Sequence, residues 1–186
     1  MPSTRERMVI STALLMREKG ARATSIDDVL AHSGAPRGSV YHHFPGGRDQ
    51  LLREATYYAG SYIAGWIERS PSSVDLLDDL LGTYREQLIA TDFRAGCPIV
   101  AVAVEADSDL QEPAAEAFGR WSELIVERLR ADGVDPERAA ELATLVVSSI
   151  EGALVIARAR RDPEPLETVH RLLRATLQAE IPGGSE

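Results

Sequence analysis

The chain has 186 residues, which suits one medium-sized domain or one domain with a small one attached. Hydrophobic residues make up 44% and charged residues 26%, as in ordinary globular proteins, which excludes a disordered chain. The single cysteine, Cys97, excludes an intrachain disulfide and a cysteine-based zinc site. No uninterrupted apolar run reaches about 18 residues and the N-terminus lacks a signal-type apolar core, so we expect a soluble cytoplasmic protein with no membrane partner.

The net charge of −9 is unevenly distributed along the chain. Residues 1–53 carry eight basic and five acidic side chains, whereas residues 54–186 carry twelve basic and twenty-four acidic ones. A basic N-terminal region on an acidic remainder is typical of a chain that presents one end to nucleic acid. An excess of three positive charges over 53 residues is also compatible with chance.

The periodicity of apolar residues predicts helices throughout and no strand. Gly20 and Gly34 suit the residue after a helix, Ser25 and Asp135 suit N-caps, and Pro136 suits a first helical position. The predicted fold is therefore all-α with about nine helices. They are expected near residues 4–19, 26–33, 39–44, 48–69, 73–90, 98–104, 113–130, 136–161 and 166–180.

Residues 24–44 have the spacing of a helix-turn-helix, with two short helices joined by a tight turn at Gly34. No Asp or Glu occurs between Asp28 and Asp49, in a chain that has 29 of them. Absence of acids favours contact with a polyanion. The outward face of the second helix carries side chains that can bond to base edges and phosphates: Arg37, Ser39, Tyr41, His42 and His43.

Each of these side chains also has a structural interpretation. The Tyr41 ring could pack against the first helix, Arg37 could be a solvated surface charge, and His43 could be a structural residue near the core. A metal site formed by His42 and His43 is disfavoured because neighbours on a helix point about 100° apart. We therefore predict no metal and no cofactor.

The stretch from Thr24 to Leu52 resembles the DNA-binding head of tetracycline-repressor (TetR) family regulators. The resemblance rests on the Thr-Ser start, Gly34 in the turn, the segment Gly38-Ser-Val-Tyr-His-His-Phe44 and the Gly-Gly-Arg-Asp-Gln-Leu that follows. Gly96-Cys-Pro-Ile-Val followed by Glu105 is similar to a subgroup associated with control of drug-resistance efflux.

The resemblance implies a homodimer in which each head places its third helix in one major groove of an operator. It implies that Arg37 and Ser39 face bases, and that Tyr41 and His42 contact phosphates or a thymine methyl group. It implies further phosphate contacts from Thr24 and Ser25 at a helix N-terminus, and from Arg48. The full predicted DNA-binding set is Thr24, Ser25, Pro36, Arg37, Gly38, Ser39, Tyr41, His42, His43 and Arg48.

The remaining helices carry apolar and aromatic residues that could surround a cavity for a small apolar or amphipathic ligand. The alternative is that these residues form only the core. The predicted ligand-binding set is Tyr62, Trp66, Tyr84, Leu88, Phe93, Phe118, Trp121 and Ile125.

The last two predicted helices have long apolar faces, and small residues near Gly152 allow another helix to approach closely. Two such helices from each subunit predict a four-helix bundle across a two-fold axis. The predicted dimerisation set is Leu145, Ser149, Gly152, Ala153, Ile156, Val169, Leu173 and Leu177.

These patterns predict three regions: a helix-turn-helix DNA-binding domain over 1–47, a helical ligand-binding and dimerisation domain over 48–181, and a disordered tail over 182–186. The predicted function is a DNA-binding transcriptional regulator, a homodimeric repressor that a small-molecule effector releases from a palindromic operator. We predict no enzymatic activity, because hydrolase and phosphate-loop motifs are absent from the sequence. The alternative function is a helical small-molecule-binding or scaffold dimer with a non-functional head.

Overall fold

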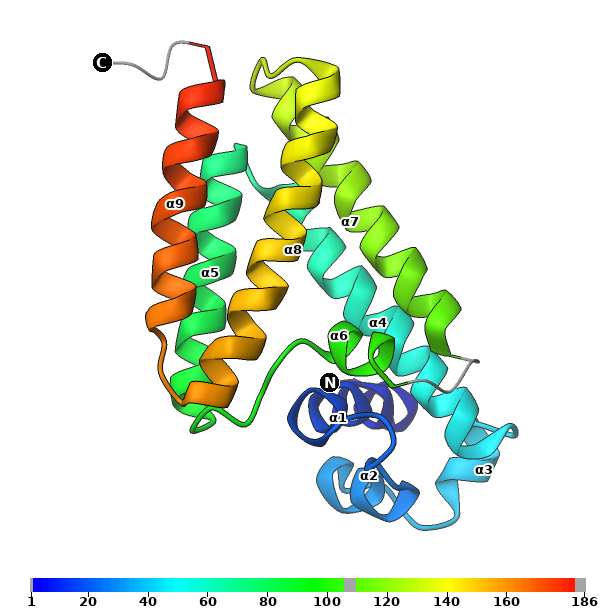
Figure 1. Cartoon of the computed structure of the whole chain (residues 1–186). Coiled ribbons are helices and arrows are strands. Elements are labelled where there is room, and N and C mark those ends of the chain that lie inside the picture. Colours follow the sequence, from blue (N-terminus) through cyan, green and yellow to red (C-terminus); the bar gives the residue numbers. More distant parts are fainter. Residues whose placement is uncertain (1, 106–109, 183–186) are drawn as a thin grey trace. The chain divides into compact units, whose positions relative to one another are not determined.

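The computed structural model describes residues 2–105 and 110–182. Within these residues the chain forms nine helices and no strand, as predicted (Figure 1). Of the predicted disordered tail, residues 183–186 lie outside the described part. The helices are α1 (Thr4–Lys19), α2 (Ile26–Ser33), α3 (Ser39–His43), α4 (Gly47–Arg69), α5 (Ser73–Ala90), α6 (Pro98–Ala103), α7 (Gln111–Ala131), α8 (Pro136–Arg160) and α9 (Glu164–Glu180).

Local capping signals explain where most helices begin and end. The Ser25 side chain accepts a hydrogen bond from the Asp28 backbone N–H, and the Asp28 carboxylate accepts one from the Ser25 backbone N–H, which forms a capping box. Gly34 follows α2 in the left-handed conformation, with φ of 65°. Helix α9 begins two residues earlier than predicted, because the Asp162 side chain caps the backbone N–H of Glu164.

The chain divides into two compact units. Unit 1 comprises residues 1–61 and 95–117, and unit 2 comprises residues 62–94 and those from 118 onward. Unit 1 therefore includes α6, which the sequence alone does not associate with the first three helices. The predicted division into functional regions 1–47 and 48–181 stays a prediction.

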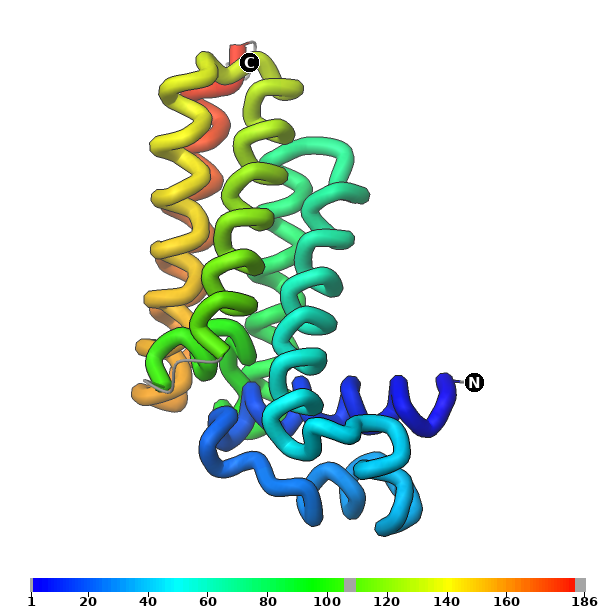
Figure 2. Tube along the Cα trace, turned by 90° about the vertical axis from the view of Figure 1, so that its right-hand side faces the viewer, coloured from blue at the N-terminus to red at the C-terminus, as the bar shows by residue number. Residues whose placement is uncertain are grey.

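In unit 1, α1 packs against both α2 and α6 (Figure 2). Phe44, which follows α3, is completely buried, and the Arg5 guanidinium lies 5.0 Å from the centre of its ring. Arg5 also donates two hydrogen bonds to the Glu54 carboxylate, at 2.7 and 2.6 Å. The C-terminal end of α3 is thus fixed by contacts to α1 and α4.

In unit 2, α9 packs against α5 and α8. Among the described residues, α8 is the one helix long and apolar enough to cross a membrane by length and composition. The search of the sequence for long apolar runs did not single out this helix, because Glu141, Glu151 and several small polar residues interrupt the run. A core helix meets the same criterion, and α8 buries Leu142, Val146, Ile150 and other residues in its own unit.

Candidate functional site

Helices α2 and α3 form the predicted helix-turn-helix. Val29 of α2 and Val40 of α3 are buried, so the apolar sides of both helices face the core of unit 1. The connection between them contains Gly34, whose positive φ costs glycine less than a residue with a Cβ atom. The polar residues of α3 therefore remain on the outer surface.

The outer surface of this motif presents Arg37 and Tyr41 to solvent. The Tyr41 side chain is 66% exposed, which excludes packing of its ring against α1 as in a core tyrosine. Arg37 is exposed, and it makes no hydrogen bond or ion pair with any other described residue. Both side chains can contact a partner without breaking an interaction of the protein.

The residues around these two side chains are partly exposed. His42 is exposed and His43 is half-buried, with their ring centroids 4.9 Å apart. Pro36 and Gly38 are exposed in the connection between α2 and α3. The Ser39 hydroxyl donates a hydrogen bond to the Pro36 carbonyl at 2.6 Å, so it ties the first residue of α3 to the turn that precedes the helix. No group of three or more potential metal ligands occurs within residues 2–105 and 110–182.

The hydroxyls of Thr24 and Ser25, two predicted phosphate contacts, are bonded within the protein. Thr24 is 1% exposed, and its hydroxyl donates to the Gly20 carbonyl at 2.7 Å. The Ser25 hydroxyl bonds to Asp28 instead. Lys19 and Ser25 hold the pKa of the Asp28 carboxyl far below its usual range. The N-terminus of α2 thus already binds the Asp28 carboxylate of the protein itself, which is paired with Lys19.

Arg48, which was also predicted to contact a phosphate, is bonded to backbone carbonyls within the protein. Its Nε donates to the Thr24 carbonyl at 2.9 Å, and its Nη2 donates to the Ala21 and Arg22 carbonyls at 2.6 and 3.0 Å. The guanidinium therefore holds the loop between α1 and α2. Arg48 is 24 or more residues from these carbonyls in the sequence, so no local pattern could reveal the contact.

The predicted ligand-binding residues do not line one common cavity. Tyr84, Trp121 and Ile125 line an internal cavity of unit 2, but its volume is only about 20 Å³. From α4, the residues at this cavity are Ile63 and Ile67, not Tyr62 and Trp66. The two pairs lie on different faces of α4, because one residue along a helix rotates the direction of a side chain by about 100°. Besides the predicted residues, the cavity is lined by Ile63, Ile67, Leu80, Val146, Val147, Ile150 and Glu151.

The other predicted ligand residues lie in separate surroundings. Tyr62 is exposed and its ring lies 5.9 Å from that of Trp66, while Leu88 is buried in the core. Phe93 has a left-handed backbone, and the Phe118 ring packs edge-on against Trp121. The aromatic residues are therefore not gathered into a single binding site in this structure.

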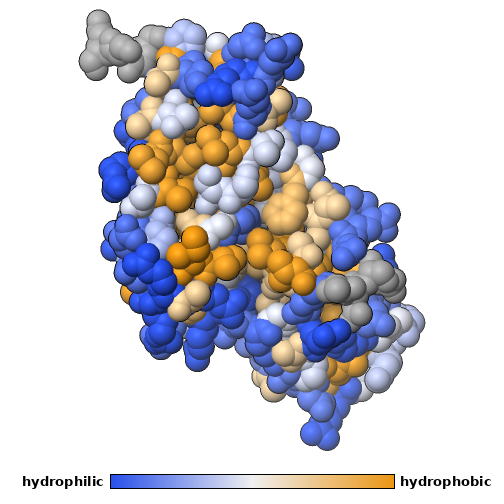
Figure 3. Space-filling view, in the orientation of Figure 1, coloured by the Kyte–Doolittle hydropathy of each residue, from blue (hydrophilic) through white to orange (hydrophobic). Residues whose placement is uncertain are grey.

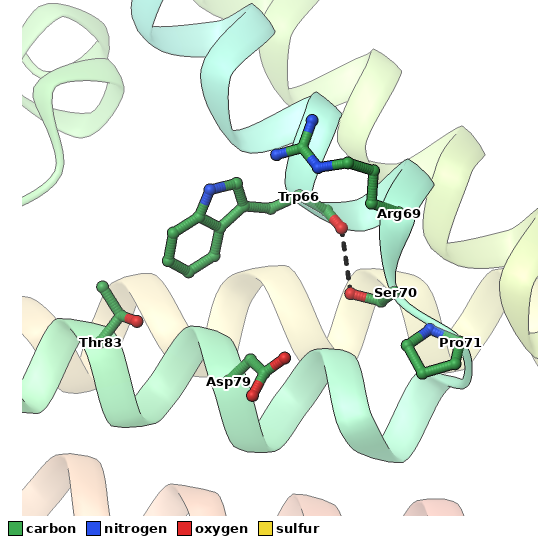
Figure 4. A pocket seen from close by; sticks show the side chains of 6 residues that line it. All are labelled: Trp66, Arg69, Ser70, Pro71, Asp79 and Thr83. Carbon is green, nitrogen blue, oxygen red and sulfur yellow. Dashed lines mark hydrogen bonds between the residues drawn. The ribbon is translucent and has the colours of Figure 1, made fainter.

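Trp66 lines a surface pocket of about 320 Å³ between the end of α4 and α5 (Figure 4). Arg69, Ser70, Pro71, Asp79 and Thr83 complete its lining. The Ser70 hydroxyl donates to the Trp66 carbonyl at 3.0 Å, which fixes the end of α4. Its lining is more polar than the apolar cavity that the sequence predicted.

The predicted dimerisation residues fall into two groups. Leu145, Gly152 and Ile156 of α8 are exposed, and Ser149 and Val169 are half-buried. Ala153, Leu173 and Leu177 are buried within the subunit, so these three are core residues. The correction arises because α8 is apolar on two faces and because the apolar side of α9 is buried in its own subunit, and the sequence did not show which face of either helix that would be. The exposed apolar surface over α8 and α9 is visible in Figure 3.

Known proteins resemble the chain in both of its regions. Residues 11–55 match the bacterial regulatory proteins of the tetR family, and residues 73–172 match the C-terminal domain of LmrA/YxaF-like transcriptional regulators. An HTH-type transcriptional regulator of Mycobacterium tuberculosis is 56% identical over 190 residues, covering 98% of each chain. The HTH-type transcriptional regulator LmrA of Bacillus subtilis is 30% identical over 170 residues, covering 88% of this chain and 90% of that protein.

Solved structures show the same fold. A TetR transcriptional regulator from Legionella pneumophila superposes with a TM-score of 0.81 at 22% identity, over 95% of this chain and 98% of that one. A mutant of the TetR family regulator CifR, solved with 26-base-pair operator DNA, gives a TM-score of 0.72 at 23% identity, over 91% of this chain and 95% of that one. These findings confirm the predicted family and fold: the chain belongs to the tetR family of bacterial transcriptional regulators, and its C-terminal region to the LmrA/YxaF-like group.

Proposed function

We propose that this regulator is a cytoplasmic homodimeric repressor that binds a palindromic operator through the helix-turn-helix of α2 and α3. The observation that supports it most is the exposed, acid-free surface around α3. From residue 29 to residue 48 no carboxylate is present, and Arg37 and Tyr41 extend from this stretch into solvent. Such a surface suits a polyanion that is read in its major groove.

Within this interface, Arg37 and Ser39 are proposed to face the bases. Tyr41 and His42 would contact phosphates or a thymine methyl group. Pro36 and Gly38 would allow the backbone to approach the DNA, since a Cβ atom at Gly38 would have no neighbour within 4 Å. Thr24, Ser25 and Arg48 support the interface from behind by fixing the start of α2.

The exposed apolar residues of α8 and α9 are proposed to form the dimer interface. Leu145 is 45% exposed and Ile156 49%, and Leu172 of α9 is also exposed. These side chains would be covered when two copies of α8 and α9 pack as a four-helix bundle. Such a dimer would present two recognition helices to successive major grooves, about 34 Å apart.

A small apolar or amphipathic effector is proposed to release the DNA by binding inside unit 2. The internal cavity beside Tyr84 and Trp121 would have to expand, because about 20 Å³ holds no more than a water molecule. Glu151 is the acidic residue in its lining, which favours an effector that carries a positive charge. The effector must prefer the state that does not bind DNA, since equal affinity for both states shifts nothing.

The first test is to select binding sites from a random pool of duplex DNA and to titrate binding of the selected site against salt. We expect a steep fall in affinity with rising salt, because phosphate contacts release counterions. Absence of salt-dependent binding would contradict the proposal and favour a ligand-binding or scaffold dimer whose head does not function.

A further inference from the structure

The loop between α1 and α2, residues 20–24, is held by charged side chains from two distant segments. Arg48 of α4 donates to three of its carbonyls, as described above. On the donor side, the Glu105 carboxylate accepts a hydrogen bond from the Arg22 backbone N–H at 2.6 Å. The Arg48 guanidinium therefore binds carbonyl groups of the loop, and the Glu105 carboxylate binds one of its N–H groups. The loop backbone is held by both charges.

Both oxygens of Glu105 lie against this loop. While Oε2 accepts from Arg22, Oε1 lies so close to Gly20 that a Cβ atom there would be only 2.3 Å away. Gly20 also has φ of 88°, a conformation that side chains disfavour. The backbone conformation therefore favours glycine at the end of α1, and a side chain there would displace the Glu105 carboxylate from its present position.

The segment that carries Glu105 is anchored at its other end too. The Gly96 backbone N–H donates to the Arg17 carbonyl in the last turn of α1, at 2.8 Å. Helix α6 lies between these two anchors and packs on α1 (Figure 1). The proposed function does not use the motif formed by Gly96-Cys-Pro-Ile-Val and Glu105. This motif bonds to the end of α1 through Gly96 and to the loop that leads to α2 through Glu105.

We propose that Glu105 is a positioning residue for DNA recognition. It fixes the α1–α2 loop and so sets the position of α2 and α3 relative to α1. The proposal rests on the proposed DNA-binding function of α2 and α3. The negative charge of the Glu105 carboxylate weakens the general electrostatic attraction to DNA. Its hydrogen bond to the loop, in contrast, is proposed to strengthen binding of the specific site. This opposition makes the two roles separable by experiment.

The experiment compares Glu105→Ala with the conservative Glu105→Gln in the full-length protein. Affinities are measured for a site selected by the wild type and for an unrelated duplex. Glu105→Ala is expected to weaken binding of the selected site about tenfold, as for a lost hydrogen bond to a charged group. Binding of the unrelated duplex should stay the same or strengthen. Glu105→Gln, which keeps an acceptor oxygen, should recover part of the loss.

Two further variants test the same contact from the Gly20 side and provide a control. Gly20→Ala should also weaken binding of the selected site, because it displaces the Glu105 carboxylate and strains the backbone at a φ of 88°. Adding Glu105→Ala to it should cost less than Glu105→Ala does in the wild type, because the Glu105 contact is already disturbed. Glu112→Gln removes one acidic charge from an exposed position of the same unit and should leave the selectivity for the selected site unchanged. Hydrogen exchange at the Arg22 amide should accelerate in Glu105→Ala and not in Glu112→Gln.

Two results would overturn the proposal. One is wild-type selectivity together with wild-type exchange at Arg22 in Glu105→Ala. The other is an equal loss of affinity for both duplexes together with a lower melting temperature, which would assign Glu105 to stability alone. Failure of the wild type to bind DNA at all would instead contradict the proposed function.

Discussion

The outer face of α3 and the outer face of α8 are both exposed, but they differ in chemistry. Helix α3 and the turn before it present Arg37, Tyr41 and His42, without any nearby carboxylate in the sequence. Helix α8 presents Leu145, Val155 and Ile156, whose burial away from water lowers the free energy. The difference shows that exposure by itself does not identify a partner. The charge and polarity of the exposed side chains indicate DNA for α3 and a second apolar surface for α8.

The largest expected effect comes from Gly152→Leu on the face of α8. A Cβ atom at Gly152 meets nothing within 4 Å in the subunit, so the substitution should leave the fold intact. In a close helix crossing, overpacking costs about 1–3 kcal/mol for each copy, and two copies are present in the dimer. Sedimentation at low micromolar concentration should show dissociation. Gly119→Leu, at an exposed and equally open position of α7, is the control and should remain dimeric.

Arg48→Ala should lower the free energy of unfolding by about 2–3 kcal/mol, because three loop carbonyls lose their charged donor. The slope of DNA affinity against salt should change little, since this guanidinium is bonded to the protein. Chemical denaturation and a salt titration check the two parts. If the salt dependence of DNA affinity fell by about one unit of slope and stability were unchanged, Arg48 would instead contact a phosphate.

Arg37→Ala should weaken specific DNA binding by about 1–3 kcal/mol and reduce sequence preference near one base step. Arg37→Lys keeps the charge but loses the paired donors, so it should preserve general affinity while preference declines. Selection from a random pool with each variant measures both quantities. Unchanged affinity and preference in Arg37→Ala would exclude Arg37 from base recognition.

The smallest effect concerns Asp78 of α5, which supports α9 behind the apolar surface. Burial would raise the pKa of Asp78, but its bonds to His170 at 2.7 Å and Arg174 at 3.2 Å outweigh it, and the pKa is lowered. The resulting stability is present above the pKa of the unfolded state, about 4, and is lost as the pH falls through the lower folded value.

Because Asp78 is partly exposed, the pH-dependent contribution should be below about 1 kcal/mol. Urea denaturation at pH 7 and pH 3 should show a larger loss in the wild type than in Asp78→Asn. The neighbouring Asp79→Asn, at an exposed position, should keep the wild-type dependence. An identical dependence in Asp78→Asn would show that the α5–α9 bonds add no stability.

The sequence by itself determined the helices and the recognition motif, because their signals are local. Ser25 and Asp135 cap the helices they were predicted to cap, and Pro98 and Pro136 stand at helix starts. A helix depends on residues three or four apart, so these patterns can be read in a short stretch of chain. The missing carboxylates around α3 are equally a property of sequence.

Tertiary structure alone decided which partner each side chain finds. Arg48 meets carbonyls 24 to 27 residues away, and Glu105 meets an amide 83 residues away. Ile63 and Ile67 line the internal cavity in place of Tyr62 and Trp66, and Ala153, Leu173 and Leu177 enter the subunit core. The physical reason is that several faces of α4 and α8 are apolar enough to be buried. Which face is covered depends on the packing of distant helices, and no local pattern encodes that choice.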